Sequence, residues 1–373
     1  MIADLPKDII TDSLKMLRLG RHHPTGSIWW TIFFIPVNTF FCSLLIILSI
    51  VGIVRYHEDD VFLAVDCLGT CTLMLHAISK QIFLHAQKNA INVLLKMKSQ
   101  FWNLDDFDGE ISKECEMILT SGKIAVRIYF SFTCAAATFY FLQPFTAHHL
   151  PSDCYVPEGW FPFLAISYMY LIPTLVPSVV GLDALFWALG LSLAVQFKLL
   201  AQKFKLLGTC HENETAILWN QLKELINYHR FLIDFCKKLN KLFSFIFFVQ
   251  SFITITSASV AVFIVMQPGN LSTRVKCLLT FVSYILEMAF YCLPAEMSVN
   301  AAIDVADSVY NSKWFRIKST EFKKCLILII GRAQIPFTFS GFGLIHINIR
   351  MFQLVCKTTF TFYTYLNTVQ NRQ

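Results

Sequence analysis

Long apolar runs separated by short charged segments set the pattern of this chain. Each run has at least about the 20 residues that an α-helix needs to cross about 30 Å of hydrocarbon. The pattern therefore predicts seven membrane-spanning helices, the last one preceded by a short helix. Their approximate limits are residues 28–54, 61–84, 124–147, 160–197, 242–266, 277–295 and 338–368.

The segments between these runs also have a helical pattern. After the fourth run, apolar residues such as Leu222, Leu225, Leu232 and Phe235 recur at helical spacing with basic residues between them. We expect an inner layer of helices over about 198–241 and 296–332, with a turn beginning at Gly208. Since neither an internal repeat nor a soluble domain boundary is visible, we predict one all-α, polytopic membrane domain over residues 1–373.

Composition agrees with a membrane protein. Hydrophobic residues make up 55% of the chain, 36 residues are Phe, and only 15% are charged. This is more apolar surface than one soluble core can bury. Asp4, Asp8 and Asp12 stand where the apolar core of a signal peptide would lie, so we expect no signal peptide.

The positions of Lys and Arg predict the orientation. Four segments that alternate with the apolar runs, residues 1–27, 79–123, 198–241 and 296–332, hold 24 of the 31 basic residues, which places the N-terminus in the cytoplasm and the C-terminus outside. That is the reverse of a G-protein-coupled receptor. The net charge of +6 is spread over these segments and is not a nucleic-acid-binding patch. In this topology the sequon at Asn213 is cytosolic and the one at Asn270 lies in a short outer loop, so only Asn270 can be glycosylated.

Candidate chemistry is sparse. Most of the twelve Cys lie in spans or inner segments, where we expect free thiols, whereas Cys67, Cys71 and Cys154 on the outer side leave one disulfide open. Neither zinc-site spacing nor a nucleophile elbow, P-loop or dinucleotide fingerprint is present. We therefore expect no enzymatic activity, no metal and no cofactor.

Polar residues follow one face of the last predicted span. In hydrocarbon a central Lys or Arg costs about 2.5–3.5 kcal/mol, so this face should meet water or protein. Taken alone, it fits a helix packed against its own bundle and a water-lined ion path equally well. For Asp183 and Glu287, which are also within spans, we favour pairing with a neighbouring span over a direct role in ligand or ion chemistry. The polar face comprises His346, Arg350, Gln353, Lys357, Thr361, Thr364 and Thr368.

Several sequence blocks occur in a specific order in the second half of the chain. They are "GLDALFWALGLSLAVQFKLLAQKF", "ELINYHRFLIDFCKKLNKLFSFIFFVQSF", "YCLPAEMSVNAAIDVADSVYNSKWF", "KKCLILIIGRAQIP" and "KTTFTFYTYL". From about Leu182 onward the chain resembles insect odorant receptors, in particular their ligand-specific subunits. The resemblance is weak before that residue.

This resemblance implies a subunit of an odorant-gated, non-selective cation channel in the plasma membrane of olfactory sensory neurons. Such subunits form hetero-oligomers, as tetramers, with a shared co-receptor, and the seventh spans line one pore. The odorant binds in the outer half of the subunit, within the second to sixth spans. A gustatory-type ligand-gated channel of the same superfamily is the alternative.

The predicted topology also nominates residues for the ligand site and the gate. The outer halves of the second to sixth spans would form an apolar, aromatic pocket suited to a small uncharged volatile molecule. Alignment with the family's pore helix puts Tyr365 and Val369 at its hydrophobic constriction, with Thr361 on the polar face, although Tyr365 also suits an interfacial anchor. The predicted ligand-binding residues are Cys71, Leu75, Ala137, Tyr140, Phe141, Tyr168, Leu171, Leu175, Ile255, Ser259, Phe281 and Tyr284.

Overall fold

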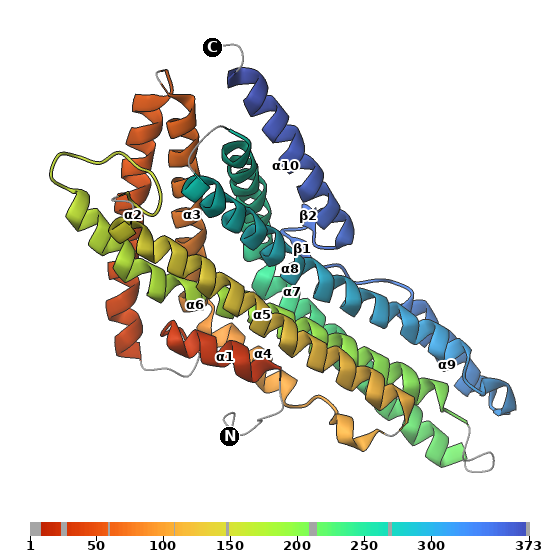
Figure 1. The fold of residues 1–373 in the computed structure, drawn as a ribbon. Helices are drawn as coiled ribbons and strands as arrows, with labels where there is room; N and C mark the ends of the chain where they lie inside the picture. The colour runs from red at the N-terminus through yellow and green to blue at the C-terminus, as the bar shows by residue number, and fades with distance from the viewer. Residues whose placement is uncertain are drawn as a thin grey trace.

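The protein, described here from a computed structural model, is built almost entirely of α-helices (Figure 1). The structure describes residues 9–23, 28–58, 60–107, 109–146, 149–208, 215–267 and 271–370. Both predicted sequon residues, Asn213 and Asn270, lie outside these ranges, and so does the side chain of Val369. The helices are α1 (Ile10–Leu19), α2 (Ile28–Tyr56), α3 (Val61–Ala86), α4 (Lys88–Lys98), α5 (Glu110–Thr146), α6 (Phe161–Lys205), α7 (Thr215–Met266), α8 (Leu271–Tyr310), α9 (Thr320–Ala333) and α10 (Ile349–Gln370).

Six of the described helices, α2, α3 and α5 to α8, are long and apolar enough to cross a membrane. The all-α, polytopic prediction is confirmed. Helices α5 to α8 continue well beyond one membrane thickness, as the helical pattern of the inner segments predicted. Helix α10 corresponds to the predicted seventh span. Its polar face gives it a lower mean hydropathy than these six helices have.

The predicted start of the seventh span near residue 338 differs from the structure. Residues 340–346 instead form a small hairpin of β1 (Ser340–Gly341) and β2 (Ile345–His346), in which Gly343 has a φ of +74°. Two α7 side chains anchor this hairpin: Asn240 Oδ1 accepts from the Ser340 N–H and Ser244 Oγ from the Phe342 N–H, both at 2.7 Å. His346 therefore lies on a strand and not on the polar helix face.

Helix α6 is the central element of the bundle. It is buried along most of its length and packs against α1, α5, α7 and α8. At its crossing with α8, Gly190 lies so close to Pro294 that a Cβ on Gly190 would be 2.8 Å from the Pro294 Cβ. The Ser298 hydroxyl donates to the Gly190 carbonyl at 2.8 Å across the same crossing.

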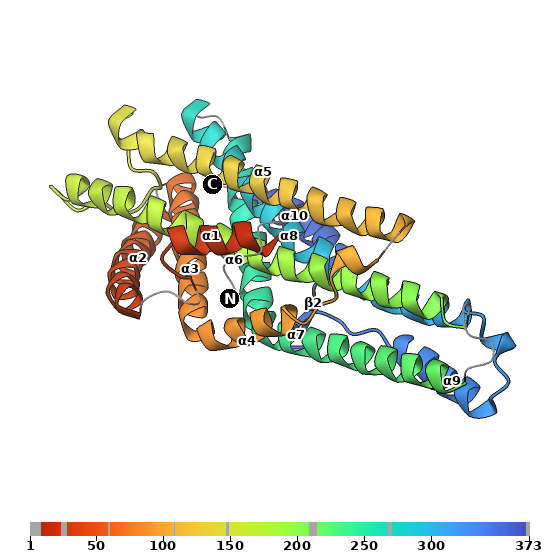
Figure 2. The ribbon, with the colours of Figure 1, turned by 90° about the horizontal axis from the view of Figure 1, so that it is seen from below.

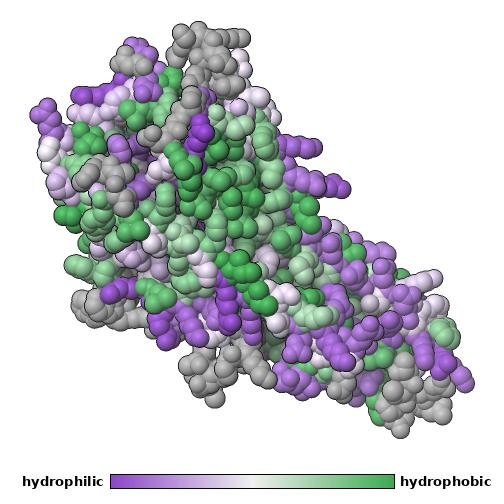
Figure 3. All heavy atoms as spheres, viewed as in Figure 1, coloured by the Kyte–Doolittle hydropathy of each residue, from purple (hydrophilic) through white to green (hydrophobic). Residues whose placement is uncertain are grey.

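The molecule has a compact helical body and an elongated extension. The extension contains the C-terminal half of α6, the N-terminal half of α7 and α9, and it projects away from α2 and α3 (Figures 1 and 2). On the face shown in Figure 3, apolar residues cover much of the body whereas the extension is largely hydrophilic. This distribution matches a membrane-embedded body and an extension in water.

Candidate functional site

An internal cavity of about 170 Å³ lies between α3, α5, α6 and α8. Pro151 and Ser152, in the segment that precedes α6, form part of its wall. Most of its lining is apolar or aromatic. The cavity brings together six of the predicted ligand-binding residues: Ala137, Tyr140, Tyr168, Leu171, Leu175 and Tyr284.

The structure places the other six predicted ligand-binding residues outside this cavity. On α3, residues 73, 74, 76 and 77 face the cavity, so Cys71 and Leu75 lie on other sides of the helix and Leu75 is exposed. Helix α7 does not contribute to the lining. Of its two predicted residues, Ser259 is buried and donates to the Ile255 carbonyl at 2.7 Å, with the Thr359 carbonyl of α10 at 3.5 Å, and Ile255 packs against the main core. The Phe141 ring lies 6.4 Å from the Phe145 ring, centroid to centroid, in a tilted arrangement, and Phe281 packs in the cluster around Phe263.

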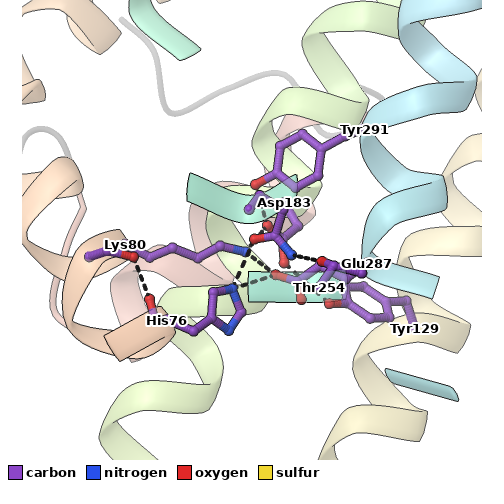
Figure 4. Close-up of polar contacts among 9 residues, drawn as sticks. His76, Lys80, Tyr129, Asp183, Thr254, Glu287 and Tyr291 are labelled. Atoms are coloured by element: carbon purple, nitrogen blue, oxygen red, sulfur yellow. Dashed lines mark hydrogen bonds and ion pairs between the residues drawn. The ribbon is translucent and has the colours of Figure 1, made fainter. Parts of the chain in front are cut away.

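One end of the cavity is polar because it meets a buried ionic network (Figure 4). Lys80 reaches from α3 to the carboxylates of Asp183 on α6 and Glu287 on α8, and it is only 1% exposed. The Tyr291 hydroxyl donates to Asp183 Oδ1 at 2.5 Å and the Tyr129 hydroxyl to Asp183 Oδ2 at 3.2 Å. The network thus connects α3, α5, α6 and α8.

His76 extends the network to α7. Its Nε2 lies 2.9 Å from both Glu287 Oε1 and Gln250 Oε1, and because both atoms are acceptors the ring proton belongs on Nε2. Gln250 in turn donates to Thr254 Oγ1 at 2.9 Å. Since His76, Tyr129 and Glu287 line the cavity, a ligand there would contact the same groups that join the helices.

The sequence reasoning found two members of this network and missed the others. The interpretation that Asp183 and Glu287 pair with a neighbouring span is confirmed. Lys80 falls in the overlap of the predicted span 61–84 and the basic segment 79–123, and the basic-residue count assigns it to the latter, but it is buried within α3. A usable signal was present, because His76 and Lys80 are four residues apart and therefore lie on one face of a mainly apolar helix.

A second ion cluster joins α3, α8 and the segment before α6. Lys276 Nζ lies 3.2 Å from Asp66 Oδ2 and 3.9 Å from Asp153 Oδ2. Burial and the neighbouring Asp66 carboxylate raise the pKa of Asp153 to about 7. Thr70 also donates to the Asp153 carbonyl at 2.7 Å, so the segment before α6 is attached to α3. Cys67, Cys71 and Cys154 are free thiols in this structure.

Helix α10 leaves its polar face uncovered within the described part of the chain. Val355 and Thr359 are buried against the bundle, where α10 packs on α7 and α8. The opposite side exposes Arg350, Gln353, Lys357, Thr361, Thr364 and Thr368. Tyr365, one of the predicted gate residues, is 61% exposed.

Sequence comparison identifies the family. The family described as 7tm Odorant receptor matches residues 61–360. Odorant receptor Or2 of Anopheles gambiae is 26% identical over 161 residues, which are 43% of this chain and 42% of that protein. Putative odorant receptor 85d of Drosophila melanogaster is 24% identical over 229 residues, which are 59% of this chain and 54% of that protein. Each alignment therefore spans less than two thirds of the relative's length.

Structural comparison agrees. The olfactory receptor OR5 from Machilis hrabei, solved alone and in complex with eugenol, superposes with a TM-score of 0.83 and 14% sequence identity over 96% of this chain and 97% of that one. The fold is therefore that of an insect olfactory receptor. The family match covers most of the chain, and it is a family of receptors and not of enzymes. The chain is a multi-pass membrane protein that belongs to the 7tm odorant receptor family.

Proposed function

We propose that this protein is the ligand-specific subunit of an odorant-gated, non-selective cation channel. It assembles with a co-receptor in the plasma membrane of olfactory sensory neurons, with its N-terminus in the cytoplasm. The observation that carries the proposal is the mainly apolar cavity between the helices in a chain of this family. Such a cavity suits a small volatile molecule that gains affinity by leaving water.

The exposed polar face of α10 supports the channel part of the proposal. Within one chain this face would lie against lipid, where Lys357 and Arg350 are costly. In an oligomer, the same faces of several subunits can surround a water-filled path and remove that cost. We place the narrow part of the path at Tyr365 and Val369, with Thr361 one turn further in.

The test is expression in cells with and without the co-receptor, with cation current recorded against a panel of volatiles. We expect odorant-dependent current only when both subunits are present. A current of the same size without the co-receptor would favour the gustatory-type channel. The absence of odorant-dependent current in cells that carry both subunits at the surface would contradict the proposal.

A matched pair of variants tests the cavity. Ala137→Trp places an indole in the cavity and should abolish the response or change the rank order of odorants. Leu75→Trp adds an equally large ring at an exposed position of α3 and should leave that rank order unchanged. If both variants kept the wild-type rank order, the odorant would bind elsewhere.

A further inference from the structure

The hydroxyl groups that line the cavity differ in one respect: whether their protons are already engaged. Thr133 and Ser283 donate to backbone carbonyls one turn away on their own helices, both at 2.8 Å. Tyr129 donates to Asp183, and Tyr168 to the Ser152 carbonyl at 3.3 Å. Tyr140 pairs with Thr280, whose own proton goes to the Lys276 carbonyl at 2.9 Å. These groups can accept a hydrogen bond but have no proton left for a ligand.

Tyr284 and Ser152 are the exceptions, because neither hydroxyl donates to an acceptor among the described residues, and of the two only the Tyr284 oxygen is fully shielded from solvent. Tyr284 is 3% exposed, and among the described residues its hydroxyl has no hydrogen-bond partner. Ser257 is a neighbouring hydroxyl in the same small side cavity of about 30 Å³, but it directs its proton to Thr72 Oγ1 at 2.8 Å and forms no hydrogen bond with Tyr284 in this structure. A buried hydroxyl without a partner costs about 1–3 kcal/mol, so buried polar groups in proteins are nearly always paired. The unused Tyr284 donor therefore points to a partner that the chain itself does not supply.

The position of Tyr284 also gives the cavity a polar and an apolar end. Its ring centroid lies 5.6 Å from that of His76, and Glu287 follows one turn later on α8. Leu171, Leu175 and Val179 of α6 line the cavity as an apolar wall. A ligand with one polar group can place that group beside Tyr284 and bury the rest of its surface against α6.

We propose that Tyr284 is the donor that orients the ligand, and that the ligand is a small oxygenated volatile with one uncharged acceptor, a carbonyl or hydroxyl oxygen. This inference rests on the proposed function, because it concerns the same cavity. An anionic acid is disfavoured because the Glu287 carboxylate lines that end. The volume of about 170 Å³ is similar to the roughly 150 Å³ of an apolar cavity that holds benzene, so the ligand has about the size of a substituted benzene ring or a seven-carbon chain.

The experiment compares ligands of equal shape that differ only in the acceptor. Acetophenone is paired with α-methylstyrene, heptan-2-one with 2-methylhept-1-ene, and heptan-2-ol with 2-methylheptane. Dose–response curves are recorded from the complete channel, with the co-receptor, for wild type and Tyr284→Phe. For the pairs that open the wild type, we expect the oxygenated member to be more potent and Tyr284→Phe to raise its half-maximal concentration about tenfold, as for one lost hydrogen bond. The hydrocarbon member should be unaffected.

Two control variants make the result specific. Tyr170→Phe removes another buried hydroxyl that has no hydrogen-bond partner in the described part of the chain and lies outside the cavity, and it should change the half-maximal concentration of neither member of a pair. Ser152→Ala removes the cavity-lining hydroxyl of the segment before α6 and should leave the preference for the oxygenated member in place.

Several results would overturn the inference. They are equal potency of ketone and alkene in the wild type, an unchanged ketone response in Tyr284→Phe, activation only by volatiles without an oxygen acceptor, or loss of the preference in Ser152→Ala. The failure of the proposed function is a different result, in which no volatile opens the wild-type complex at the cell surface.

Discussion

At the scale of single residues, the buried lysine of α3 is the most consequential feature. An isolated charge in the middle of a membrane is expensive. Lys80 is tolerated because two carboxylates pair with its ammonium group, and the Tyr291 hydroxyl donates a hydrogen bond to one of them. Removing one partner of such a network costs far more than the network contributes, because the remaining charges stay buried. Lys80 therefore holds α3, α6 and α8 in one relative arrangement.

We expect Lys80→Met to destabilise the receptor by about 3–5 kcal/mol, because it leaves Asp183 and Glu287 buried together without a cation. Thermal denaturation in detergent and surface labelling measure the effect. Adding Glu287→Gln to Lys80→Met removes one of the unpaired carboxylates and should recover part of the loss.

The matched control is Lys238→Met. Lys238 pairs with Asp234 at 2.7 Å on the exposed side of α7, and such surface pairs contribute about 0–1 kcal/mol. Equal losses in Lys80→Met and Lys238→Met, or no recovery in the double variant, would contradict the proposed role of the network.

The network also shows what sequence reasoning at the residue scale can and cannot supply. Charged residues inside apolar runs are visible in the sequence, and Asp183 and Glu287 were identified in that way. Their partner was not, because Lys80 lies near the end of a run and was counted with the inner segment. Pairing between residues 103 positions apart depends on how two helices are rotated, which local patterns do not specify.

At the scale of elements, the apolar runs predicted the existence of the spans well and the faces of the helices less well. The predicted ligand-binding residues on α6, Tyr168, Leu171 and Leu175, all line the cavity because they follow one helical stripe. Those on α3 and α7 do not. The C-terminal half of α7 contacts other helices: Ser257 donates to Thr72 of α3, and Ser259 Oγ lies 3.5 Å from the Thr359 carbonyl of α10.

The crossing of α6 and α8 depends on a single small residue. Gly190→Ala would place a methyl group 2.8 Å from the Pro294 Cβ, in a part of the core where neither helix can yield easily. We expect a loss of about 1–3 kcal/mol in the free energy of unfolding, measured by thermal or denaturant unfolding in detergent.

Gly331→Ala is the control for this change. Gly331 also lies in a helix, α9, but no heavy atom lies within 4 Å of the added Cβ. Its replacement by Ala should stabilise the helix by about 0.5–1 kcal/mol. If Gly190→Ala were as well tolerated as Gly331→Ala, the two helices would not be closely packed at this point.

At the scale of the whole molecule, the cavity and the exposed face of α10 lie apart from each other. Helices α7 and α8 connect the two. The network at the polar end of the cavity includes Glu287 on α8 and reaches Gln250 on α7 through His76. Both helices also pack against α10. A ligand that changes the position of α7 or α8 would therefore move helices that contact the proposed pore helix, α10.

Tyr365 provides the test of the pore in the assembled channel. If apolar rings close the path by excluding water, Tyr365→Ala should widen and wet the constriction, which raises current in the absence of odorant or changes ion selectivity. If Tyr365 instead anchors the end of α10 at the membrane interface, its loss should lower surface expression and leave single-channel properties unchanged. Phe145→Ala, which removes a similarly exposed aromatic ring from the end of α5, is the matched control and should affect neither basal current nor selectivity. Normal basal current and selectivity in Tyr365→Ala and in Val369→Ala, each assembled with the co-receptor, would remove both residues from the gate.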